Sequence, residues 1–237
     1  MKIFDRNKSV EGRSAATFAE IDIFGKANPY LKSTDPKLRA RQDQLTGKRK
    51  KEFEKLKAEK GYHEERLENF PGLNFDEALE LALILNPEEN QLAPPAKIAK
   101  DIRNDIIAAK DEFLKTPKQV RFFTSVNTPL DYHGVDAFFI INGIPITLDA
   151  SLDPRKTERL KADIYLPGDF PLEMEDEEGY MNWIENIAET ILNKYEEKLA
   201  NLKNDNISWK DLNNIKTISK VLNLKDISNL QEILKIA

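Results

Sequence analysis

The sequence contains no cysteine, only two histidines and nine glycines among 237 residues. Without cysteine the chain can form neither a disulfide nor a thiolate metal site, and His63 and His133 are too few for a histidine-rich zinc site. The glycines form neither a GxGxxG nor a Walker pattern, and no serine stands in a nucleophile-elbow context. These absences exclude the common phosphate-cradling loops and the Ser/His/Asp triad.

Long apolar runs are also missing from the sequence. No run approaches the roughly 20 residues that a transmembrane helix needs, and no signal peptide is recognised. The sequence therefore predicts no membrane association and a cytoplasmic location. A hydrophobic content of 40%, a charged content of 32% and a net charge of −5 indicate a polar-rich globular chain, whose length allows one large domain.

The densest β-forming stretch is a predicted hairpin, with strands at residues 135–141 and 144–152. The two strands are joined by Asn142-Gly143, a dipeptide that favours a two-residue type I′ turn because both positions need positive φ. This turn predicts a register that places Ile141 opposite Ile144 and, further along, Asp136 opposite Asp149. One face of the hairpin is then apolar and belongs to the core.

Two aspartates that face each other across a hairpin repel unless something compensates their charge. A divalent cation provides that compensation, and carboxylate oxygens suit Mg²⁺ or Mn²⁺. Asp136 and Asp149 are therefore candidate metal ligands and catalytic residues. The alternative interpretation is that a bulge shifts the register, or that each aspartate caps a loop or pairs with an arginine.

Helices are predicted before the hairpin. Residues 15–23 are compatible with a helix or a strand, and residues 74–85 form a helix that begins at the N-cap Asn74. Residues 96–115 form a second helix with an isoleucine stripe that should pack on the sheet, followed by a first strand at 120–126. Asp105 lies at the edge of that stripe, where it is either a further metal ligand or a solvated flank residue.

After the hairpin, Asp153-Pro154 is a helix-start signature that predicts a basic helix at 154–162. A short strand is expected at 163–166. Helices at 180–202, 207–222 and 224–236 should either pack on the core or bind a protein partner or a second copy of the chain.

The segment from residue 37 to residue 60 is basic within an acidic protein. Lys48, Arg49, Lys50 and Lys51 are consecutive and form a possible nucleic-acid contact. The alternative is a solvated helix with intrahelical Glu–Lys pairs, which the scarcity of apolar residues and the absence of interleaved aromatics favour.

The residues GVDAFF at 134–139 and ITLDAS at 146–151, within the order helix, three strands, helix, strand, resemble the PD-(D/E)XK nuclease-like superfamily. The resemblance covers roughly residues 96–166. It implies an α+β fold with a restriction-endonuclease-like α-β-β-β-α-β core and additional terminal helices. The chain would then divide into a charged helical arm at 1–73, the core at 74–170 and a helical region at 171–237.

The resemblance further implies that Asp136 and Asp149 bind Mg²⁺ in a nuclease that cleaves phosphodiester bonds. A lysine is expected two positions after the second acid, but Ser151 stands there. In some members the lysine comes from the following helix, which makes Lys156 the first candidate and Lys161 the second. His133 is a weaker catalytic candidate. If no lysine reaches the metal, the alternative function is a catalytically inactive nuclease fold used for protein interaction or as a structural module.

Overall fold

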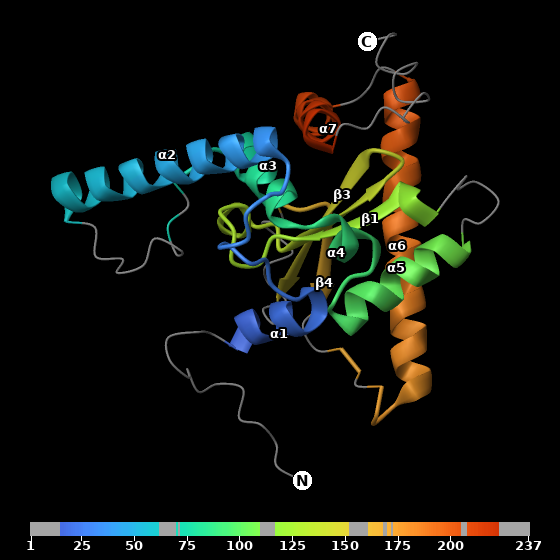
Figure 1. The fold of residues 1–237 in the computed structure, drawn as a ribbon. Coiled ribbons are helices and arrows are strands. Elements are labelled where there is room, and N and C mark those ends of the chain that lie inside the picture. The colour runs from blue at the N-terminus through green and yellow to red at the C-terminus, as the bar shows by residue number, and fades with distance from the viewer. Residues whose placement is uncertain are drawn as a thin grey trace.

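The computed structural model describes residues 15–61, 70, 72–109, 117–151, 161–167, 170–171, 173–204 and 208–222. Within these residues one mixed sheet lies at the centre, in the order β1-β2-β3-β4, and helices cover both of its faces (Figure 1). The strands are β1 Val120–Thr124, β2 Ala137–Ile141, β3 Ile144–Ser151 and β4 Ile164–Pro167. The pairs β1–β2 and β2–β3 are antiparallel, whereas β3–β4 is parallel. The α+β class expected from the sequence is confirmed.

The β2–β3 hairpin turns at Asn142 and Gly143, with φ values of 49° and 83°. Such positive φ values at both central positions are what an Asn-Gly turn accommodates. The turn sets the predicted register, with Ile141 opposite Ile144 and the pairing continuing to Ala137 opposite Leu148. This part of the prediction is confirmed.

The register changes immediately before Ala137. The Asp136 N–H donates to the Leu148 carbonyl at 2.9 Å, so two successive residues lie opposite Leu148, as in a β-bulge. The extra residue reverses the alternation, and Val135 packs in the cluster that contains Phe138 instead of the one that contains Ala137. The predicted strand start at 135 and the direct pairing of Asp136 with Asp149 are therefore wrong.

The first face of the sheet is covered by α1 Ala15–Phe24, α5 Lys97–Ala109 and α6 Glu177–Lys203. The helical alternative for residues 15–23 is therefore the correct one. Ile98, Ile102 and Ile106 of α5 are buried against Phe139 and its neighbours, which confirms the predicted isoleucine stripe. The predicted helix continues to residue 115, but residues 110–116 are outside the described ranges.

The second face packs against α3 Phe75–Leu85 and α7 Trp209–Leu222, and α2 Pro36–Lys60 packs on α3. The predicted N-cap of α3 is confirmed, because Asn74 and Glu77 form a reciprocal capping box. A short helix, α4 Glu88–Leu92, follows α3. The Asn86 side chain both donates to the Thr124 carbonyl and accepts from its N–H, which pairs the exposed edge of β1.

The connections include two single 3-10 turns, η2 Pro117–Gln119 before β1 and η3 Asp131–His133 between β1 and β2. The predicted helices at 154–162 and 224–236 fall largely or wholly on residues outside the described ranges. None of the helices in the described part of the chain combines the length and apolar character that crossing a membrane requires.

Candidate metal centre

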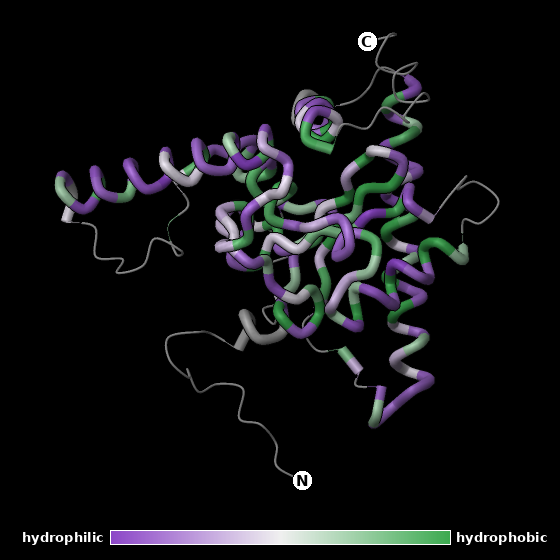
Figure 2. The backbone as a smooth tube through the Cα atoms, in the orientation of Figure 1, coloured by the Kyte–Doolittle hydropathy of each residue, from purple (hydrophilic) through white to green (hydrophobic). Residues whose placement is uncertain are grey.

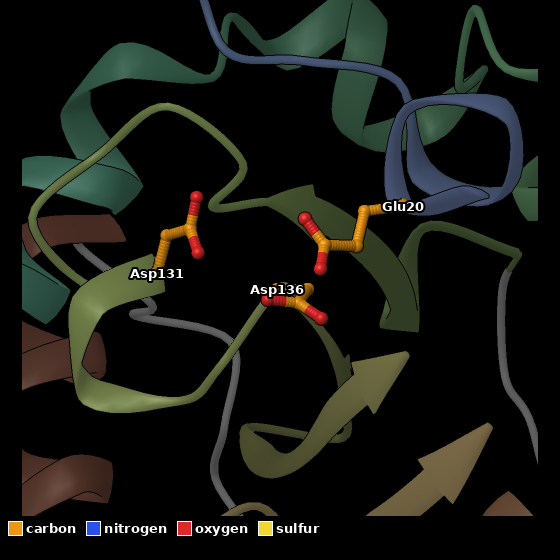
Figure 3. A group of neighbouring side chains, drawn as sticks. All are labelled: Glu20, Asp131 and Asp136. Carbon is orange, nitrogen blue, oxygen red and sulfur yellow. The ribbon is translucent and has the colours of Figure 1, made fainter. Parts of the chain in front are cut away.

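Three carboxylates meet at the point where β2 begins. One oxygen from each of Glu20, Asp131 and Asp136 lies within 4.8 Å of the others, and the side chains converge on one another (Figure 3). Glu20 comes from α1, Asp131 from η3 and Asp136 from the bulge before β2. Residues more than a hundred positions apart in the sequence are thus brought together by the packing of α1 on the sheet.

Glu20 is placed by the packing of α1. It lies one turn before Phe24, so the two side chains share a face of the helix. Phe24 is buried and its ring stacks on Phe122 of β1 with centroids 6.3 Å apart. The Gly25 carbonyl then accepts a hydrogen bond from the Thr124 hydroxyl at 3.1 Å. These contacts hold the last turn of α1 against β1 and direct Glu20 toward the start of β2.

Asp131 is held by the loop between β1 and β2. Its Oδ2 accepts the Asn127 N–H at 3.1 Å, and its carbonyl accepts the Gly134 N–H at 2.8 Å. Gly134 closes the turn with a φ of 75°, a left-handed conformation that glycine adopts without strain. These hydrogen bonds within the loop fix the position of Asp131.

Asp136 is the most buried member of the group, with 2% of its surface exposed. Its Oδ2 accepts the Ala150 N–H at 2.7 Å, so the bulge turns the carboxylate toward the end of β3. Burial raises its pKa well above the ordinary value, and the charges of Glu20, Asp149 and Asp131 raise this pKa further against the opposing effect of the Ala150 N–H. Ionisation of Asp136 therefore costs free energy, which a bound cation would offset and which protonation of the carboxylate avoids.

The other two predicted metal ligands lie outside this group. Asp149 is buried in β3 opposite Tyr165, and its charge is near enough to raise the pKa of Asp136. Asp105 is half-buried on α5. Among the described residues, the group of three or more potential ligands whose atoms lie within 4.8 Å of one another consists of Glu20, Asp131 and Asp136, and it includes neither Asp149 nor Asp105.

The two lysine candidates have different outcomes. Lys156 lies outside the described residues. Lys161 is exposed, and its aliphatic chain lies against Gly134, where an added Cβ would be 3.4 Å from the lysine Cδ. Ser151, at the position where the resemblance expects a lysine, is buried, and its carbonyl accepts the Tyr165 hydroxyl at 2.6 Å.

His133 belongs to the same turn as Asp131 but contacts another part of the molecule. Its Nε2 lies 3.0 Å from the Leu73 carbonyl, and its ring meets Phe75 edge-on with centroids 5.7 Å apart. The histidine therefore ties the β1–β2 loop to the start of α3. This is a structural role that needs no catalysis.

The basic stretch lies on α2, which extends away from the rest of the molecule and is largely hydrophilic along its outer part (Figures 1 and 2). Arg49 is buried, with its Nε donating to the Phe70 carbonyl at 2.6 Å, and Lys48 pairs with Glu77 at 2.6 Å. Lys50 and Lys51 are exposed. The prediction that Arg49 contacts nucleic acid is wrong, because its guanidinium faces the interior.

Glu20 and Asp131 are the members of the group that sequence reasoning missed. The choice between helix and strand for residues 15–23 was open, and only the helix puts Glu20 on the face of Phe24. Asp131 stands two residues before His133 in the sequence, but its direction depends on the Asn127 and Gly134 contacts. A helical assignment for α1, combined with the pairing of Glu20 and Phe24 four residues apart, was the available signal.

In comparisons with known proteins, no family model matches the sequence, and no curated protein or solved structure gives a significant match. The assignment of function therefore depends on the geometry described above.

Proposed function

We propose that this chain is a divalent-metal-dependent phosphodiesterase that acts on nucleic acid and has a PD-(D/E)XK nuclease-like core. The observation that carries the proposal is the convergence of Glu20, Asp131 and Asp136 at the start of β2. The order of a helix, three antiparallel strands and a further strand parallel to the third supports it. The resemblance of residues 134–139 and 146–151 to the superfamily adds to this support.

The three carboxylates fit Mg²⁺ or Mn²⁺ as a ligand set. Both ions prefer hard oxygen ligands, and a small ion bound by a few carboxylates completes its shell with water and substrate oxygens. Burial raises the pKa of Asp136, and the neighbouring carboxylates raise this pKa further, so a bound cation would offset the buried negative charge. When bound there, the ion would position a water molecule and stabilise the charge that develops on the phosphate.

The surrounding residues have distinct roles in this proposal. The Ala150 N–H orients the Asp136 carboxylate, and the Asn127 N–H orients Asp131. Asp149 adds negative charge close to Asp136 and thereby strengthens cation binding. The superfamily pattern expects a lysine at the position of Ser151, where it would help to activate the water. We place Lys161 in this role, because its side chain lies beside Gly134 in the turn that carries Asp131. Lys156 is the other candidate.

The second candidate function is an inactive nuclease fold that serves as an interaction module. It is favoured by the burial of Ser151, which leaves the usual lysine position inside the protein. The partner would be a protein or a second copy bound through the C-terminal helices, or nucleic acid bound through the exposed Lys50 and Lys51.

Cleavage assays separate the two candidates. The full chain is incubated with single-stranded DNA, duplex DNA and RNA, in Mg²⁺, in Mn²⁺ and in chelator. We expect cleavage with metal and none in chelator. Glu20→Gln, Asp136→Asn and Asp149→Asn should each reduce the rate toward the chelator level, whereas Asp105→Asn should not. Lys161→Ala and Lys156→Ala identify which lysine participates.

Activity that survives Asp136→Asn and Glu20→Gln would place the chemistry elsewhere and overturn the proposed site. Absence of cleavage of every substrate, together with absence of metal binding, would overturn the enzyme proposal and favour the interaction module.

A further inference from the structure

Two exposed tyrosines belong to segments next to those that build the acidic group. In the described part of the chain, the large hydrophobic residues that are exposed are Tyr30, Tyr132, Met174 and Met181. Tyr30 exposes 76% of its surface and Tyr132 exposes 44%. The two methionines belong to a different region, in and just before the first turns of α6.

Tyr132 directly follows Asp131 in η3. Successive residues of a 3-10 turn are about 120° apart around its axis, because the turn has about three residues. Asp131 points inward at Asp136 (Figure 3), so Tyr132 projects from the turn in another direction, toward solvent. Tyr132 is therefore an exposed aromatic residue on the turn that carries Asp131.

Tyr30 lies in the segment that connects α1 to α2, where the Leu31 carbonyl accepts a hydrogen bond from the Gln42 side chain of α2 at 2.5 Å. The Ala27 N–H donates to the Val126 carbonyl at 3.1 Å, which places this segment alongside the loop that carries Asp131. Tyr30 lies three residues further on, in a turn closed by the Leu31 N–H and the Asn28 carbonyl. Three residues of extended chain span at most about 11 Å, so the backbone of Tyr30 lies within that distance of Ala27.

Phosphate contacts alone would bind nucleic acid weakly at this end of the molecule. The chain has a net charge of −5, and three carboxylates converge at the proposed site. The neighbouring segments carry the exposed lysines Lys26, Lys32 and Lys161, and Lys32 pairs with Asp43. Affinity must then come largely from contacts other than charge, and aromatic rings stack on nucleobases of any sequence.

We infer that Tyr30 and Tyr132 are stacking platforms that select single-stranded nucleic acid for the acidic site, an inference that rests on the proposed function. Bases within a duplex are stacked on one another and cannot lie on an external ring, whereas unpaired bases can. The substrate class is therefore an unpaired strand, DNA or RNA, whose bases stack on the tyrosines while its backbone lies at the carboxylates.

Binding of fluorescent oligonucleotides to the full chain in chelator tests the inference without cleavage. The probes are a single-stranded DNA, an RNA of the same sequence and the corresponding DNA duplex. We expect single strands to bind at least about tenfold more tightly than the duplex. Tyr30→Ala and Tyr132→Ala should each weaken single-strand binding by about 5- to 150-fold, the range for loss of one stacked base.

Matched variants separate stacking from a change in folding. Tyr30→Phe and Tyr132→Phe keep the rings and should bind as the wild type does, and so should the exposed controls Met174→Ala and Met181→Ala. Because few phosphates are contacted, the salt dependence should be shallow. The expected slope of log K against log salt is about −0.7 for each contacted phosphate.

Equal binding by both alanine variants, duplex binding as tight as single-strand binding, or no binding of any single strand would overturn the inference. Cleavage by the wild type that both alanine variants retain would overturn it while the proposed function stands. Tyrosine-dependent binding of single strands without cleavage in Mg²⁺ or Mn²⁺ would support the inference while the proposed function fails.

Discussion

Carboxylates gather near both ends of strand β3, but a lysine of the chain neutralises them at only one of the two ends. Near its start, the Lys198 ammonium lies 2.8 Å from Asp163, 2.9 Å from Asp211 and 3.0 Å from the Pro145 carbonyl. Near its end, Ala150 donates to Asp136, whose pKa is raised by burial and by three neighbouring carboxylates. At the start of β3 the Lys198 ammonium therefore neutralises the aspartates, whereas at its end the carboxylates repel one another.

Under the proposed function, this difference separates a charge cluster that the chain neutralises itself from one that a bound cation would neutralise. The Lys198 network connects α6, β3, α7 and the residue before β4, so it holds four parts of the fold together. The acidic group adds repulsion that the fold must tolerate, which is typical of sites where an external ligand completes the structure. We therefore expect opposite effects on stability when a charge is removed at each end.

The largest effect is expected at the Lys198 end. Lys198→Met removes the ammonium but keeps the length of the side chain, and it leaves Asp163 and Asp211 close together in a largely buried site. Removing one partner of a buried ion pair costs about 3–5 kcal/mol, and partial solvation of the aspartates places the expected loss near about 3 kcal/mol. Urea unfolding measures it.

The matched control is Lys194→Met on the same helix. Lys194 pairs with Glu197 at the surface, where an ion pair contributes about 0–1 kcal/mol. Equal losses in the two variants would show that the Lys198 network is no more important than a surface pair, and would remove the comparison.

A smaller effect of opposite sign is expected at the acidic end. Asp136→Asn keeps the shape and an oxygen acceptor for the Ala150 N–H but removes the buried charge. At neutral pH in chelator the variant should unfold with a free energy higher than that of the wild type by about 1 kcal/mol, which corresponds to a melting temperature about 2–4 °C higher. A lower melting temperature would show that the carboxylate stabilises the fold without a metal.

The pH dependence of stability follows from the same group. Because the pKa of Asp136 is higher in the folded than in the unfolded chain, the folded state binds more protons between the two values. Its contribution to stability is present below the unfolded pKa of about 3.9 and is lost as pH rises through the raised folded pKa. In chelator, the difference between Asp136→Asn and wild-type melting temperatures should therefore grow with pH across this window. A difference that is constant with pH would contradict the raised pKa.

The sequence predicts the locally encoded parts of this structure well. Asn142-Gly143 sets the hairpin register, Asn74 with Glu77 sets the start of α3, and the spacing of Ile98, Ile102 and Ile106 sets the buried face of α5. In each case the determining residues lie within a few positions of one another, so a turn or helix geometry translates directly into structure.

The site itself depends on contacts between distant segments. The bulge at Asp136 involves Leu148 and Ala150, and Glu20 reaches it because Phe24 packs on Phe122. Arg49 shows the same limit, since its burial depends on the Phe70 carbonyl, 21 residues away. Sequence patterns therefore predicted Asp136 as a metal ligand but did not predict the carboxylates of Glu20 and Asp131 that lie beside it.

Calorimetric titration of the full chain with Mn²⁺ tests the central claim most directly, because it needs no substrate and no activity. We predict about one ion bound per chain by the wild type and by Asp105→Asn, with binding lost or strongly weakened in Glu20→Gln and Asp136→Asn. Absence of Mn²⁺ binding by the wild type, or binding that is unchanged in both Glu20→Gln and Asp136→Asn, would contradict the account.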